Sequence, residues 1–202
     1  MGAEVDATLT FSTAAERAVA ADEFANAVAR ARRLDTAAWY SLYTLAFPQV
    51  YRYVAARVPS RHEAEDVTEE VFVGALQSVA GLRATDEAGF LAWLYQIARH
   101  KLADRLRLRY RRPTEPLDPA FDIPDGDPSP EQEALRADER ATVRAALADL
   151  TADQREVIML KYVLEYDNAK AASILGKSPG AVNQLQHRAL AQLRKILTKR
   201  GV

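Results

Sequence analysis

A cluster of polar side chains near the carboxyl end of the chain has residue types suited to contacting DNA. The cluster consists of Asn183, Gln184, His187 and Arg188. Amide side chains can pair bidentately with adenine, whereas Arg suits guanine or phosphate. Farther along, Lys195 and its basic neighbours extend the positive charge for phosphate contacts. The alternative interpretation is an ordinary amphipathic helix whose polar face only meets water.

The elements around this cluster have the pattern of a helix-turn-helix. The sequence predicts helices over 151–164 and 167–175, a break at Gly176, and a last helix opened by Ser178 with Pro179 at its first position. In this motif the first turns of the second helix enter the major groove. The apolar stripe of the last helix is Val182, Leu185, Ala189, Leu193 and Ile196.

A basic run ends the helix predicted over 90–112. Residues 105–112 contain five arginines in eight positions. Together with Trp93, Tyr95 and Tyr110, which are available for stacking, this run suits a single-stranded nucleic acid. The alternative is a solvated helix end that the helix dipole favours.

Residues for catalysis or metal binding form no recognisable pattern. His62, His100 and His187 occur singly, and the sequence contains no HExxH, no Gly-rich phosphate loop and no Gly-x-Ser-x-Gly. The chain has no cysteine, which removes disulfides and thiolate metal sites and fits a reducing compartment. We therefore expect no enzyme activity, no cofactor and no metal. We also expect a cytoplasmic protein without a signal peptide or membrane insertion.

Charge and proline divide the chain of 202 residues, whose net charge of −1 conceals large local differences. Residues 37–112 carry +3, 113–139 carry −8 and 140–202 carry +6. The segment 113–130 holds six of the nine prolines and no basic residue, which predicts an extended acidic linker. We expect little hydrophobic core to cross this linker. The predicted parts are an amino-terminal extension (1–21), a first domain (22–112), the linker (113–130) and a second domain (131–202).

The fold class predicted from these patterns is all-α, with two small helical domains. The helices expected before the helix-turn-helix are 22–33, 39–57, 61–79, 90–112 and 131–148. In the third of them, Val67, Val71 and Ala75 line one face at spacings of four. Asp66 and Glu70 then lie off that face, which makes them available to a partner.

These segments, in this order, resemble the extracytoplasmic-function (ECF) sigma factors of the sigma-70 family, over roughly residues 24–197. LYTLAFPQVYRYVAARV resembles region 2.1, AEDVTEEVFVGAL resembles region 2.2, and FLAWLYQIARHKLADRLRLRYRR resembles regions 2.3 to 2.4. The segment from Leu150 to Arg194 resembles region 4. The resemblance implies that the first domain binds core RNA polymerase (its beta and beta-prime subunits) and opens the −10 element, while the second domain reads the −35 element of promoter DNA.

The resemblance also implies a role for individual positions. By position, the resemblance assigns binding of the core polymerase to Asp66, Glu69, Glu70 and Phe72. It assigns contacts to the −10 element to Arg83, Trp93, Arg99, Lys101 and Arg105. The −35 set is Asn183, Gln184, His187, Arg188 and Lys195. An anti-sigma factor is a common further partner in this family.

Some positions depart from the family pattern. The family usually has Gln where Glu69 stands, and often Lys and Arg where Asn183 and Leu185 stand, so the promoter sequence cannot be copied from other members. One alternative function is a helix-turn-helix transcription regulator that acts without being a polymerase subunit. Another is a helical adaptor that binds only protein.

Overall fold

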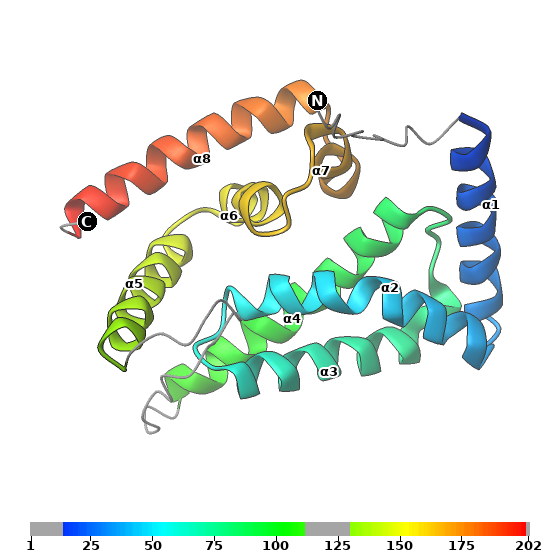
Figure 1. The fold of residues 1–202 in the computed structure, drawn as a ribbon, viewed down its shortest axis with the longest axis horizontal. Helices are drawn as coiled ribbons and strands as arrows, with labels where there is room; N and C mark the ends of the chain where they lie inside the picture. Colours follow the sequence, from blue (N-terminus) through cyan, green and yellow to red (C-terminus); the bar gives the residue numbers. More distant parts are fainter. Residues whose placement is uncertain (1–13, 112–129, 201–202) are drawn as a thin grey trace, which may run out of the picture.

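The described part of the chain is helical throughout. The computed structural model describes residues 14–111 and 130–200, and these form eight α-helices and no strand. In chain order they are α1 (Ala14–Ala31), α2 (Thr36–Ala55), α3 (Arg61–Ser78), α4 (Glu87–Arg111), α5 (Pro130–Ala148), α6 (Ala152–Ile158), α7 (Asn168–Leu175) and α8 (Pro179–Lys199) (Figure 1). A 3-10 turn, η1 (Val79–Gly81), follows α3, and a π-helical turn, η2 (Met159–Val163), follows α6. The predicted all-α class is confirmed.

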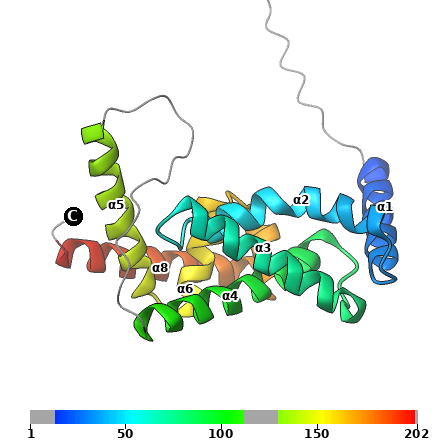
Figure 2. The ribbon, with the colours of Figure 1, turned by 90° about the horizontal axis from the view of Figure 1, so that it is seen from below.

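Helices α2, α3 and α4 pack against one another and form the first half of the molecule together with α1 (Figure 2). The contact face of α3 is the predicted stripe, in which Val67, Val71 and Ala75 are fully buried. Phe90 and Leu94 of α4 are fully buried as well. These faces were predictable because apolar residues three or four positions apart lie on one side of a helix.

Helix α1 begins earlier than the sequence predicted. We expected a short helix from Asp22 with an extension before it, whereas α1 starts at Ala14. Most of the intervening residues, AAERAVAA, are strong helix formers, so nothing ends the helix at Asp22. Phe24 packs α1 onto α4, with its ring centroid 5.8 Å from that of Phe90. Residues 1–13 of the predicted extension lie outside the described residues.

Side-chain caps and one glycine set the boundaries of the second half. Thr151 Oγ1 accepts a hydrogen bond from the Gln154 backbone N–H, and Gln154 Oε1 accepts one from the Thr151 N–H. Ser178 caps α8, with Pro179 at the first position. Gly176 ends α7 at φ +62°, a left-handed conformation that glycine adopts without strain. The predicted helix-turn-helix and its caps are confirmed.

The two halves lie against each other. In Figure 1, α6 and α7 lie between α8 and the group α2–α4, so α8 forms an outer edge. The main contacts between the halves join α4 to α7 and α2 to η2. Buried residues of both halves belong to one continuous core. Our expectation that little core would be shared across the linker is therefore wrong. Residues 112–129, which include nearly all of that linker, lie outside the described residues.

Candidate nucleic-acid interface

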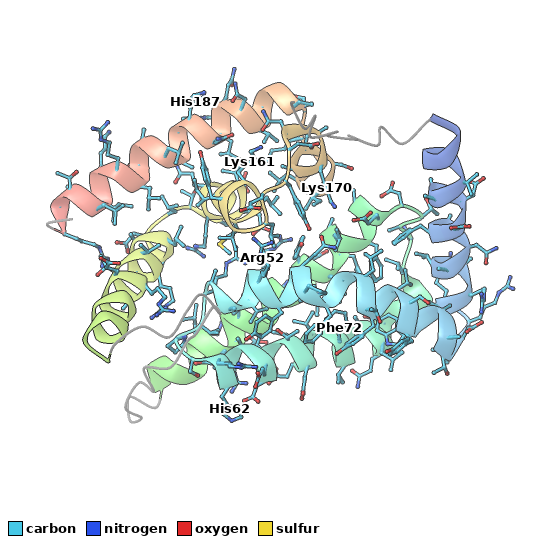
Figure 3. All side chains as sticks on the ribbon, in the orientation of Figure 1. Arg52, His62, Phe72, Lys161, Lys170 and His187 are labelled. Carbon is cyan, nitrogen blue, oxygen red and sulfur yellow. The ribbon has the colours of Figure 1, made fainter. Side chains whose placement is uncertain are left out.

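Helix α8 presents the residues predicted to contact the −35 element. The exposed residues are Asn183, Gln184, His187, Arg188 and Lys195. The buried residues of the same helix are Val182, Ala189 and Ile196. At about 100° per residue, the exposed set spans about 140° of the helix surface, opposite the buried set. The structure thus brings the predicted set together at the outer edge of the molecule, where Figure 3 shows His187.

One hydrogen bond beside this surface was not predicted. Gln186 Nε2 of α8 donates to the Tyr162 hydroxyl of η2 at 2.9 Å. The bond fixes α8 relative to the π-helical turn, and Tyr162 stays half-exposed next to it. The two residues are 24 positions apart, so no helical periodicity relates them.

The acidic face of α3 lies opposite basic residues of α4. Arg105 contacts Glu70 at 3.3 Å and Asp66 at 3.7 Å, and Lys101 contacts Glu70 at 3.7 Å. Each pair is partly exposed, so its contribution to stability is below about 1 kcal/mol. Glu69 is exposed on the same face, which borders a hollow of about 330 Å³. The structure thus pairs residues that were predicted to bind the polymerase with residues that were predicted to contact the −10 element.

Phe72, the fourth residue predicted to contact the polymerase, is buried between α2 and α3. Only 6% of its surface is exposed. Its ring centroid lies 4.7 Å from that of Tyr43 and 6.0 Å from that of Phe47 (Figure 3). Aromatic pairs at these separations stabilise helix packing. In this structure Phe72 positions α3, and its ring does not form part of the acidic surface.

The residues predicted to contact the −10 element do not form one continuous surface. Arg83 is exposed between η1 and α4, and Trp93 is half-buried with its ring 5.8 Å from that of a neighbouring phenylalanine. Lys101 and Arg105 face α3, whereas Arg99 faces the second half. Positions 99 and 101 are about 200° apart around a helix, which explains the division.

Tyr95 is not available for stacking on a base, and that prediction is wrong. Its ring is fully buried and stacks on Tyr53 with the centroids 4.6 Å apart. Its hydroxyl shares a hydrogen bond of 2.8 Å with that of Tyr166. Burial, followed by this hydrogen bond, raises the pKa of Tyr95. The side chains of residues 108–112, including Tyr110, lie outside the described residues.

The carboxylate of Glu156 on α6 is buried against the first half. Its Oε2 accepts hydrogen bonds from the Tyr53 hydroxyl at 2.8 Å and from Arg57 at 3.2 Å, and its Oε1 accepts one from Arg99 at 2.8 Å. Arg57 also lies over the Tyr53 ring, 3.7 Å from its centroid. Burial, the largest cause, raises the pKa of Tyr53 to about 12. Glu156 could not be recognised from the sequence, because α6 alone gives no sign of what covers it.

Among residues 14–111 and 130–200, no group of three or more His, Cys, Asp or Glu side chains could hold a metal ion. None of the helices found there is both long and apolar enough to cross a membrane.

Two family models match the chain in the order that the sequence indicated. Sigma-70 region 2 matches residues 42–112, and Sigma-70, region 4 matches residues 140–193. ECF RNA polymerase sigma factor ShbA of Streptomyces griseus is 34% identical over 177 residues, which cover 84% of this chain and 92% of ShbA. ECF RNA polymerase sigma factor SigD of Mycobacterium tuberculosis is 35% identical over 158 residues, covering 76% of this chain and 74% of SigD.

Solved structures agree with these matches. CnrH, in complex with the cytosolic domain of CnrY, superposes with a TM-score of 0.56 at 26% identity and covers 89% of this chain and 98% of that chain. RpoE from Bartonella quintana, in complex with the anti-sigma factor NepR, shares the fold with a TM-score of 0.51 at 22% identity, covering 77% of this chain and 94% of that chain. From both family models and the relatives, the chain belongs to the ECF RNA polymerase sigma factors of the sigma-70 family.

Proposed function

We propose that this chain binds core RNA polymerase and directs initiation at promoters by recognising their −10 and −35 elements. The observation that carries the proposal is α8, which exposes two amides, a histidine and an arginine on the second helix of a helix-turn-helix. Matches to both sigma-70 regions support a polymerase subunit over a free-standing regulator, which would need only the second. The chain acts in the cytoplasm and has no enzyme activity or cofactor of its own, because the polymerase performs the chemistry.

Each surface receives a role within this proposal. Asp66, Glu69 and Glu70 present the acidic face of α3 to a basic surface of the polymerase. The exposed set of α8 reads the −35 element in the major groove. The −10 element contacts Arg83 and Trp93 first, because Arg99, Lys101 and Arg105 are engaged in ion pairs within the chain. An anti-sigma factor is a further proposed partner.

Run-off transcription with purified core polymerase tests the function. The template is a library in which the −35 and −10 positions are randomised and each promoter carries its own barcode downstream of the start site, so that sequencing the transcripts identifies the promoters that were used. We expect the chain to select a restricted promoter sequence that core polymerase alone does not use. A transcription regulator would bind DNA without conferring initiation, and an adaptor would do neither. Barcodes that point to promoters as random as those used by core alone would contradict the proposal.

A further inference from the structure

Among the residues that the structure describes, polar side chains of the two halves meet along their boundary. At the centre, Glu156 of the second half is surrounded by Tyr53, Arg57 and Arg99 of the first. Near the start of α4, Lys170 contacts Glu87 at 2.8 Å. The remaining contacts are those of Tyr166 with Tyr95 and Gln49, and of Arg52 with the Val163 carbonyl. Figure 3 shows Arg52 and Lys170 pointing across this boundary.

The central contact depends on both halves being present. Among the described residues, every hydrogen-bond partner of the Glu156 carboxylate belongs to the first half. The side chains of Glu156 and Arg57 are only 6% and 11% exposed. A buried charge is tolerated only while its partners are in place. If Glu156 lost its charge, Arg57 would remain buried and uncompensated, whereas separation of the halves would let water reach it.

The same contact occupies a residue assigned to DNA. Arg99 is one of the predicted contacts to the −10 element. Its Nη1 is bound to Glu156 at 2.8 Å, while 43% of its side chain stays exposed. Helix α7, the first helix of the helix-turn-helix, packs against α4 as well. The bond to Glu156 and a contact of the same guanidinium nitrogen with a DNA phosphate are therefore alternatives.

We propose that Glu156 is an intramolecular lock: the free chain closes on itself through the Tyr53–Arg57–Arg99 cluster, and it opens before Arg99 contacts DNA. The closure itself follows from the buried charge. Only the masking of Arg99 rests on the function proposed above. A ligand that binds only the open state has its apparent affinity reduced by the fraction of chain that is closed.

Distances between the halves test the lock directly. The chain has no cysteine, so spin labels can be placed on the exposed positions Ser41 of α2 and Thr198 of α8 by substitution with cysteine. Double electron–electron resonance on the full chain should give one narrow distance. With Glu156→Gln we expect a broader distribution at longer distance. The matched control is Glu65→Gln, which removes an exposed ion pair of 2.8 Å within α3 and should leave the distance unchanged.

Tyr53→Phe is a second variant in case Glu156→Gln folds poorly, because it keeps the buried ring and removes only one donor to Glu156. It should shift the distribution in the same direction, to a smaller extent. A broad, long distribution in the unmodified chain would overturn the lock. An unchanged narrow distance in both variants, with helicity intact by circular dichroism, would overturn it as well.

Binding of a labelled single-stranded DNA of about 20 nucleotides, longer than the usual site, tests what the lock masks. By fluorescence anisotropy, Glu156→Gln should bind about tenfold more tightly than the unmodified chain, and Glu65→Gln should bind equally. If the distance lengthens while DNA affinity stays constant, the lock stands. The masking of Arg99, and with it the role proposed for that residue, would then be overturned.

Discussion

At the scale of residues, α8 separates side chains that can read a base from those that can only hold a phosphate. Asn183 and Gln184 carry amides that match the donor and acceptor pattern of adenine. Lys195 carries a point charge about three turns farther along and is also exposed. The two kinds of contact respond differently to sequence and to salt, so they can be measured apart.

We expect Gln184→Ala to lose about 1 to 3 kcal/mol of binding at one base position and to relax the preference there. Lys195→Ala should weaken binding to all sequences alike and lower the salt slope by about 1. The measurement is holoenzyme binding to single-base variants of a selected promoter at several salt concentrations. Should Gln184→Ala leave every base preference unchanged, its side chain is only solvated surface.

Tyr53 gives a residue-scale prediction about pH. Its pKa is raised from 10.0 to about 12, chiefly by burial. Because the folded pKa lies above the unfolded one, its contribution to stability is complete below pH 10 and is lost as pH rises toward 12. The absorbance of tyrosinate, titrated in the unmodified chain and in Tyr53→Phe, isolates this group as a difference. A difference curve centred near pH 10 would mean that Tyr53 is not buried.

At the scale of elements, the turn before α8 depends on one glycine. Gly176 has φ +62°, and a Cβ added there would meet no atom within 4 Å, so the penalty for a side chain is purely conformational. Gly176→Ala should therefore lower the free energy of unfolding by about 1 kcal/mol. Gly180→Ala, in the first turn of α8 and equally free of neighbours, should raise it by up to about 1 kcal/mol. Urea unfolding gives the free energy of unfolding of both variants. A decrease for Gly176→Ala together with an increase for Gly180→Ala would show that backbone conformation, and not the size of the added methyl group, sets the effect.

Helix α3 is the element expected to meet the polymerase. Replacing Glu69, which is exposed, with Arg should slow association with core polymerase, most strongly at low salt. Glu65→Arg on the same helix gives the same change of charge outside the predicted set. Stopped-flow association with core polymerase at two salt concentrations compares them. Equal rates for both variants would show that only net charge matters and that α3 has no specific docking face.

At the scale of the whole molecule, the shared core makes the halves interdependent. If a protease site is inserted within 118–129 and cleaved, we expect the two fragments to elute together in size-exclusion chromatography, since buried residues of both halves belong to one core. The same cleavage in Glu156→Gln should release them more readily. If the two fragments of the cleaved chain elute separately even with Glu156 intact, the halves are independent domains.

The sequence by itself determined the local structure and the family. The cap at Ser178, the break at Gly176 and the apolar stripes of α3 and α8 could all be predicted, because each depends on residues within one or two helical turns. The start of α1 was missed, because helix-forming residues continue through Asp22. The exposed set of α8 could be predicted for the same local reason.

The tertiary structure alone decided which face meets which. Periodicity shows that Tyr95 and Phe72 lie on a helix, but it does not show that other aromatic rings cover them. Glu156 is joined to Arg99 and Tyr53 across 57 and 103 positions, and no local pattern connects residues so far apart. On an isolated helix a charged side chain is simply solvated. It becomes part of an interface only when a second element buries it together with its partners. The lock at Glu156 therefore exists only in the folded chain.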